Sequence, residues 1–118
     1  LKEWDVAGVV IIYLAIVVVV IAGIWKAFEK AGAPGWAAII PIYNYYVMVK
    51  MAGKEGWWVI LIFIPLVNIV VAFIVMIEIA KNFGKSTGFG VGMVLLSFVF
   101  WPILGFGDAE WEVAPVNV

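Results

Sequence analysis

The chain has 118 residues, of which 67% are apolar and 13% are charged, and its formal net charge is −1. A soluble domain averages about 45–50% apolar and 25% charged residues, so this composition excludes an ordinary water-soluble fold and indicates helices that lie in lipid. The sequence contains no Cys, His or Arg, so we expect no enzyme activity, no cofactor, no metal and no nucleic-acid partner.

The first hydrophobic segment predicts a membrane-spanning helix over residues 5–31. Its stretch Val6–Ile24 carries no charge and is too long for a β-strand. Glu3 and Asp5 precede it where a signal peptide would carry basic residues, so we interpret the segment as a retained span. The Gly and Pro residues of Ala31–Gly35 then predict a turn.

The second segment, residues 35–51, is too short for an ordinary span. A helix over its apolar part, Trp36–Val49, would reach only about 21 Å, and Pro41 interrupts it. A short kinked span and a re-entrant segment both satisfy the length rules; we favour the short kinked span.

The third and fourth segments predict full spans over residues 56–84 and 88–106. From Trp57 the third segment runs for 21 positions before its first charge, at Glu78. A helix of this length reaches about 30 Å, which is the thickness of the hydrocarbon core of a bilayer. An acidic tail over residues 107–118 follows the fourth segment.

Together these segments predict a single all-α domain over residues 1–118. It is an integral membrane helical bundle with three full spans and one short Pro-kinked segment that is a span or re-entrant. The lysines divide four to three between the two sides of the membrane in either version. The positive-inside rule therefore places the start of the first helix outside and the loop Lys26–Pro34 inside, and it leaves the side of the C-terminus open.

The second and third segments share a sequence pattern. In each, a Gly-Trp pair precedes Pro-x-x-Asn, over Gly35–Asn44 and again over Gly56–Asn68. Two interpretations are open. The pattern marks a repeated helical unit, as in some transporters, or it reflects the interfacial chemistry that both segments need.

Pro65 and Asn68 are the first candidate site, near the middle of the third span. Proline frees the backbone carbonyl four residues earlier. The carboxamide of Asn68, one turn away, either bonds a neighbouring helix or lines a path for a substrate or an ion.

The most polar cluster in the second segment comprises Pro41, Tyr43, Asn44 and Tyr46, with Tyr45 between them. Tyrosines and an amide could hold a polar headgroup or a small solute. Tyrosines also gather at membrane interfaces because one end of the ring prefers water.

Two further candidates lie in the third and fourth segments. Glu78 forms either an interfacial pair with Lys81, one turn on, or part of a proton relay. Gly88 and Gly92 match the small-xxx-small pattern of close helix packing.

Residues 28–111 resemble a known family through several long motifs: FEKAGAPGWAAIIPIYNYYVMVKMAG, GWW, IPLVN, EIAKNFGKSTGFGVG and PILGFGDAEW. The family comprises small bacterial multi-span membrane proteins and is described only as a domain of unknown function. The same module is similar to a region ahead of the catalytic part of some type I signal peptidases. The resemblance implies a multi-span membrane module that accompanies other proteins, and it carries no serine–lysine pair onto this sequence.

We therefore expect a non-enzymatic, multi-pass protein of the bacterial inner membrane that acts as a structural or accessory subunit of a membrane assembly. Its expected partners are membrane lipids and either further copies of itself or a larger membrane complex. Two alternatives remain open. One is a small transporter or channel with a polar path at Asn44 and Asn68, and the other is a processed hydrophobic subunit of a lipid-containing filament.

Overall fold

A computed structural model describes residues 2–118, and within this range all regular structure is helical. This confirms the expected all-α class. The elements, with η denoting a 3-10 helix, are α1 (Glu3–Lys30), η1 (Gly35–Ile39), α2 (Pro41–Met51), η2 (Gly56–Phe63), α3 (Val67–Asn82), α4 (Thr87–Leu95) and α5 (Ser97–Phe106).

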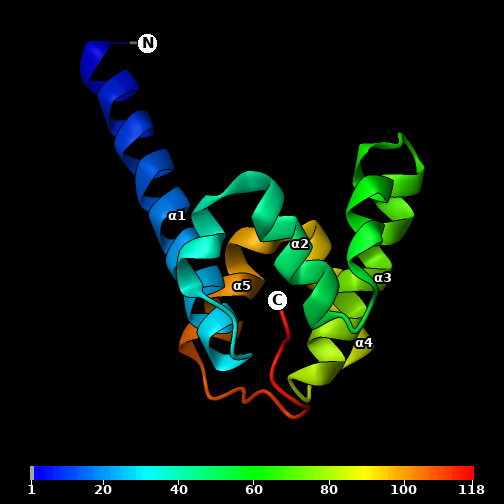
Figure 1. Cartoon of the computed structure of the whole chain (residues 1–118). Coiled ribbons are helices and arrows are strands. Elements are labelled where there is room, and N and C mark those ends of the chain that lie inside the picture. The colour runs from blue at the N-terminus through cyan, green and yellow to red at the C-terminus, as the bar shows by residue number, and fades with distance from the viewer. Residues whose placement is uncertain (1) are drawn as a thin grey trace.

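The first helix, α1, is long and straight and rises away from the rest of the molecule (Figure 1). Its 28 residues correspond to about 42 Å. Within Asp5–Lys30 its mean hydropathy reaches 3.0, and α1 alone among the helices of residues 2–118 is long and apolar enough to cross a membrane. This agrees with the first expected span in position and composition.

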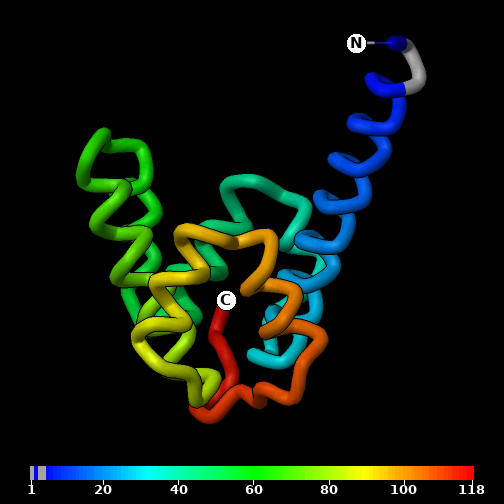
Figure 2. Tube along the Cα trace, turned by 180° about the vertical axis from the view of Figure 1, so that it is seen from behind, coloured from blue at the N-terminus to red at the C-terminus, as the bar shows by residue number. Residues whose placement is uncertain are grey.

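The other three expected helices, over residues 35–51, 56–84 and 88–106, are each divided by a reversal of the chain. η1 packs against α2, η2 against α3, and α4 against α5 (Figures 1 and 2). We call these pairs hairpins 1, 2 and 3. Segments that hydropathy predicts as single helices are therefore helical hairpins with an apolar tip.

The backbone at each tip explains why the chain reverses there. Ile40 and Ile64 are extended, with φ of −91° and −99°, because the proline that follows each one disfavours the helical conformation. At both tips the carbonyl of the isoleucine accepts a hydrogen bond from the backbone N–H of the asparagine four residues later. The distance is 2.7 Å from Asn44 to Ile40 and 2.9 Å from Asn68 to Ile64. The shared Pro-x-x-Asn pattern thus corresponds to one repeated turn.

The third hairpin makes the same turn without a proline. Leu96 takes the place of the isoleucine, with φ −133° and ψ 56°, and its carbonyl accepts the amide of Phe100 at 3.0 Å. Pro102 lies inside α5.

At the opposite ends of the hairpins, glycines terminate three helices in the same way. Gly32, Gly53 and Gly84 have φ of 85°, 78° and 75°, a left-handed conformation that glycine adopts without a Cβ penalty. After α1, the amide of Ala33 bonds to the carbonyl of Phe28 at 2.9 Å, and the corresponding bonds follow α2 and α3. These are Schellman caps, which satisfy the last helical carbonyls.

These helix ends lie together, and we call this side of the molecule the polar end. Lys30 Nζ donates to the carbonyls of Leu104 (2.8 Å) and Gly107 (3.0 Å), which joins α1 to the end of α5. The tail after α5 crosses the polar end, where its Val116 amide bonds to the Ala31 carbonyl at 2.9 Å. Six of the seven lysines lie near these helix ends. Lys30, Lys50, Lys54, Lys81 and Lys85 lie in the last turn of a helix or in the adjoining loops, and Lys26 lies one turn before Lys30.

Close helix contacts build the core between the polar end and the tips. α1 and α5 meet at Gly23 and Gly105, where a Cβ on Gly23 would lie 2.7 Å from Pro102 Cα. Nearby, the rings of Phe28 and Trp101 meet edge to face at 6.4 Å, and both side chains are fully buried. Glycine therefore sets the approach of these helices, and aromatic side chains fill the space beside it.

Two arms extend beyond this core on opposite sides of the molecule (Figures 1 and 2). One arm is the N-terminal part of α1, residues 6–19, and the other is the upper part of hairpin 2, residues 60–70. Most of the large apolar side chains in both arms are exposed. The molecule therefore has a charged end and a strongly apolar end.

Candidate functional site

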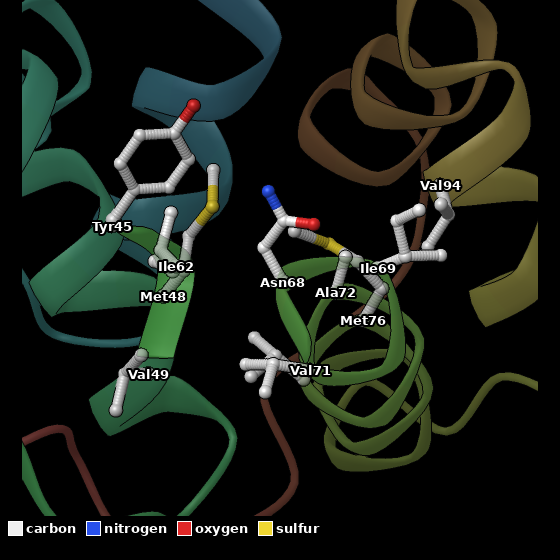
Figure 3. A pocket seen from close by; sticks show the side chains of 11 residues that line it. Tyr45, Met48, Val49, Ile62, Asn68, Ile69, Val71, Ala72, Met76 and Val94 are labelled. Carbon is white, nitrogen blue, oxygen red and sulfur yellow. The ribbon is translucent and has the colours of Figure 1, made fainter. Parts of the chain in front are cut away.

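Two adjoining pockets lie between the hairpins and share Tyr45, Met48 and Met76. Figure 3 shows the first of them. We call them together the vestibule. Their volumes are about 310 and 270 Å³, near the lower limit of about 300 Å³ for small-molecule sites. The first pocket lies between hairpin 2 and α2, and the second between α1, α2, α3 and α5.

Each hairpin contributes one amide or aliphatic hydroxyl side chain to the vestibule from near its tip, in addition to the phenol of Tyr45: these are Asn44, Asn68 and Ser97. Two of them bond to the backbone of their own hairpin, since Asn44 Nδ2 donates to the Ala38 carbonyl at 2.9 Å and Ser97 Oγ donates to the Met93 carbonyl. The Asn68 carboxamide makes no hydrogen bond within residues 2–118 and points into the space beside α2 (Figure 3). Asn68 is thus the group best placed to meet something outside the fold.

Apart from Tyr45, the remaining lining is apolar, and two of its side chains are flexible methionines. Met48 and Met76 lie where the two pockets meet, and methionine adapts readily to ligands of different shape. Between the vestibule and the polar end lies the core, and the buried side chains of residues 2–118 are all apolar. The vestibule therefore suits a hydrophobic group that carries one or two polar atoms.

The other aromatic candidates of the second segment lie outside the vestibule. Tyr43 stacks between Trp36 and Tyr46, with ring centroids 5.4 and 5.9 Å away. Tyr46 in turn packs against Gly56, where a Cβ would lie 2.7 Å from its ring. This stack joins hairpin 1 to the start of hairpin 2, and Tyr45 provides the only tyrosine in the lining of the two pockets.

The two prolines of the candidate sites act on the backbone. Pro41 occupies the first turn of α2 and also lines the second pocket, and its fixed φ suits this position. Pro65 precedes Leu66, whose φ is +69°, so this non-glycine residue lies in a conformation that L side chains rarely adopt. Both prolines therefore shape a tip, whereas the sequence suggests a kink within a span.

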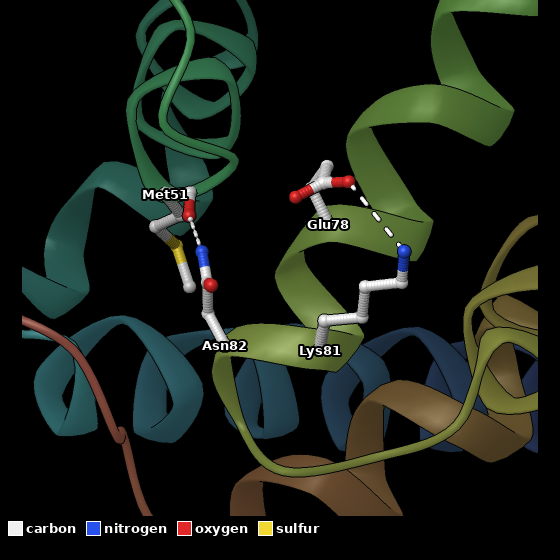
Figure 4. Close-up of polar contacts among 4 residues, drawn as sticks. All are labelled: Met51, Glu78, Lys81 and Asn82. Carbon is white, nitrogen blue, oxygen red and sulfur yellow. Dashed lines mark hydrogen bonds and ion pairs between the residues drawn. The ribbon is translucent and has the colours of Figure 1, made fainter.

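Glu78 lies at the polar end, one helical turn from Lys81 (Figure 4). Their charged atoms are 3.8 Å apart and both side chains are more than a third exposed, so this is an exposed ion pair of modest strength. On the adjoining face of the same turn, Asn82 Nδ2 donates to the Met51 carbonyl at 2.8 Å (Figure 4). Asn82 thereby connects hairpins 1 and 2.

Gly88 and Gly92 do not form one packing face. A Cβ on Gly88 would meet only Ser86 Oγ, at 3.7 Å, whereas one on Gly92 would lie 2.5 Å from the ring of Phe100. The close approach of α4 to α3 occurs instead at Gly90, where a Cβ would lie 2.5 Å from Ile77 Cα. Gly92 therefore closes hairpin 3, and Gly90 joins hairpins 2 and 3.

Sequence reasoning missed Ser97, Met48 and Met76 as lining residues. A signal for Ser97 exists, since it is the one hydroxyl or amide side chain between Gly92 and Gly107. The methionines carry no such signal, because apolar residues surround them in the sequence.

Comparison with known proteins gives a family and no activity. No curated protein and no solved structure matches the chain. The model of one family, described as "Family of unknown function (DUF5684)", matches residues 36–113. This range contains all three hairpins except the first residue of η1. The chain therefore belongs to this family of unknown function.

Proposed function

We propose that the protein is a non-enzymatic integral membrane protein that serves as a structural or accessory subunit of a membrane assembly. The single observation that carries the proposal is the separation of charge from apolar surface. Six of seven lysines and the acidic tail lie at the polar end, while both arms and the hairpin tips expose apolar side chains. Water suits the first surface and hydrocarbon suits the second.

Helix lengths support a membrane placement with one span and three re-entrant hairpins. α1 is long enough to cross a hydrocarbon core of about 30 Å. The 16 residues of α3 reach about 24 Å and the 11 of α2 about 16 Å, so the hairpins enter from the polar end and stop inside the bilayer. This arrangement replaces three full spans, which would require hairpins 2 and 3 to open into continuous helices.

The lysines then give the orientation. With hairpins that all enter from one side, six of the seven lysines share that side and Lys2 lies on the other. The positive-inside rule assigns the six to the cytoplasm and the N-terminus to the outside. We propose the bacterial inner membrane as the location.

An accessory role fits the surface that this placement leaves for contact. The exposed side chains of the two arms are almost all aliphatic or aromatic, and they lie at the depth of the lipid tails. The molecules that they can touch are lipids, other copies of the chain and other membrane proteins. Blue-native electrophoresis and crosslinking in mild detergent should detect such an assembly, and a species that is strictly monomeric and without partners would contradict it.

The absence of native cysteine permits a direct test of the membrane placement. Lys54→Cys and Lys85→Cys variants should both react with a membrane-impermeant maleimide from the same side of oriented vesicles, and Lys2→Cys should react only from the other side. The expected three-span bundle would instead place residues 54 and 85 on opposite sides. Labelling of those two positions from opposite sides would therefore overturn the proposed placement.

A second candidate function is a small transporter or channel. The observation that favours it is the presence of Asn44 and Asn68 in adjoining pockets of the vestibule. In proteoliposomes, an Asn68→Leu variant should then lose solute or ion flux relative to the unmodified chain. Unchanged flux would remove this candidate.

A further inference from the structure

The two arms of one copy cannot cover each other. Figure 2 shows the N-terminal half of α1 and the upper part of hairpin 2 on opposite sides of the bundle, with no element between them at the tip level. α1 uses its lower half to contact α5 and η1. Each arm therefore presents an apolar face that the chain's own fold leaves open.

Each arm also carries one polar side chain without a partner. In α1 this residue is Tyr13, the one hydroxyl or amide side chain between Asp5 and Trp25, and it is 66% exposed. In hairpin 2 it is Asn68, which lines the vestibule. Neither side chain makes a hydrogen bond within residues 2–118. In hydrocarbon, an unpaired hydroxyl or carboxamide is strongly unfavourable.

These two polar groups lie at a similar distance from the polar end along their helices. Tyr13 is 13 residues from Lys26 along α1, and Asn68 is 13 residues from Lys81 along α3. Both lysines lie near the polar end, so each polar side chain is about 20 Å from it along its helix. In the proposed placement this depth is well inside the hydrocarbon core.

We propose that two copies of this chain pair in the membrane so that the α1 arm of each packs on hairpin 2 of the other, with Tyr13 of one copy bonded to Asn68 of its partner. The pairing rests on the proposed membrane placement, and it identifies a second copy of the chain as the partner in the proposed assembly. A twofold axis along the membrane normal keeps every residue at its own depth. It therefore brings groups of equal depth together, and it does so twice in one closed interface.

This pairing also explains why a second copy, in preference to a lipid, covers the arms. A lipid tail would cover the aliphatic side chains and would leave the Tyr13 hydroxyl and the Asn68 carboxamide unpaired. The partner's α1 satisfies both groups at once, since a phenol donates and a carboxamide oxygen accepts. In the pair, the partner's Tyr13 becomes part of the vestibule wall beside Asn68.

The test uses two tagged forms of the chain that are expressed together. One form carries Tyr13→Cys, the other carries Asn68→Cys, and a short bifunctional thiol reagent is added to intact membranes. A crosslinked species with both tags is expected. The matched control replaces Tyr13→Cys with Ile11→Cys, because Ile11 has the same exposure of 66% and faces about 200° away on α1.

Equal crosslinking from positions 11 and 13, or none from either, would overturn the pairing. The same membranes are labelled at Lys54→Cys and Lys85→Cys, so a failure of the membrane placement is recognised separately. One-sided labelling without a crosslink between positions 13 and 68 refutes only the pairing.

A second measurement isolates the hydrogen bond. Removing the hydroxyl in Tyr13→Phe should raise the dimer dissociation constant in detergent about tenfold, as expected for the loss of two symmetric interhelical hydrogen bonds. Tyr43→Phe is the matched control, because this tyrosine stacks between Trp36 and Tyr46 outside the vestibule, and it should leave the dissociation constant unchanged. An equal effect of both variants would contradict the assigned bond.

Discussion

The side-chain amide of Asn82 donates a 2.8 Å hydrogen bond to the backbone carbonyl of Met51, the last residue of α2. The end of a helix leaves such carbonyls without an intrahelical partner. The Asn82 carbonyl also accepts the amide of Glu112 at 2.8 Å, so this residue joins hairpin 1, hairpin 2 and the tail.

Replacing Asn82 with leucine should therefore destabilise the polar end. We expect a loss of about 1 kcal/mol in the free energy of unfolding, as for other interhelical hydrogen bonds, measured by thermal or denaturant unfolding in detergent. The control is Asn117→Leu, in an exposed tail residue whose side chain makes no hydrogen bond within residues 2–118. Equal losses in the two variants would show that the Met51 contact is not the cause.

Replacement by alanine should lower the stability of the protein at Gly53, the left-handed glycine after α2, and raise it at Gly8, a glycine within α1. A Cβ on Gly53 would meet nothing within 4 Å, so Gly53→Ala tests only its φ of +78°, and it should cost about 1 kcal/mol. A Cβ on Gly8, in α1, also meets nothing within 4 Å. Gly8→Ala should stabilise the protein by about 0.4–1 kcal/mol. Helix content on detergent titration measures both, and a stabilising Gly53→Ala would contradict the cap.

The contact between α4 and α3 depends on one glycine. In Gly90→Ala the new methyl would lie 2.5 Å from the backbone of Ile77, so the helices must separate, at a cost of about 1–3 kcal/mol. Gly88→Ala, two residues earlier, meets nothing closer than 3.7 Å and should change stability by less than about 0.5 kcal/mol. Comparison of the two melting temperatures in the same detergent checks this, and the reverse order would refute the packing described between hairpins 2 and 3.

The Lys30 ammonium group holds the start of the tail through its bonds to Leu104 and Gly107. Lys30→Met keeps the aliphatic stem and removes both hydrogen bonds. The docked tail should lose about 1 kcal/mol of stability, so residues 107–118 should be cleaved several times faster in limited proteolysis. Lys26→Met removes only an exposed ion pair with Glu29 at 4.0 Å and should leave the cleavage rate unchanged. Faster cleavage in both variants would indicate a general effect of charge.

The sequence was sufficient for the helical class and the first long helix, and it left a repeated unit as one of two interpretations. Composition and the uncharged run Val6–Ile24 predict α1 well, because a long apolar run has few other structural solutions. The shared Pro-x-x-Asn pattern correctly marks an equivalent position in hairpins 1 and 2, at Asn44 and Asn68. Its structural meaning, a reversal of direction, is not contained in the pattern.

Chain reversal escapes hydropathy because both sides of an apolar turn have the same composition. The segment Trp57–Ile77 is long and uncharged, and a full span and a hairpin with an apolar tip fit it equally. Hairpin 3 is harder still, since Leu96 turns the chain without proline or glycine. The vestibule depends on where these turns meet in space, so only Asn44, Asn68, Pro41 and Tyr45 of its lining could be anticipated.

The unequal reach of the hairpins gives the proposed membrane protein a wedge-shaped outline. The cross-section of the molecule is widest near the polar end, where the helical elements of residues 2–118 lie side by side. Beyond the tips of hairpins 1 and 3, only α1 and hairpin 2 continue (Figure 1). The leaflet beside the lysines must therefore make room for much more protein than the opposite leaflet does. A protein of this shape fits best in a bilayer whose lysine-bearing surface is convex. Many copies would therefore accumulate in strongly curved membrane.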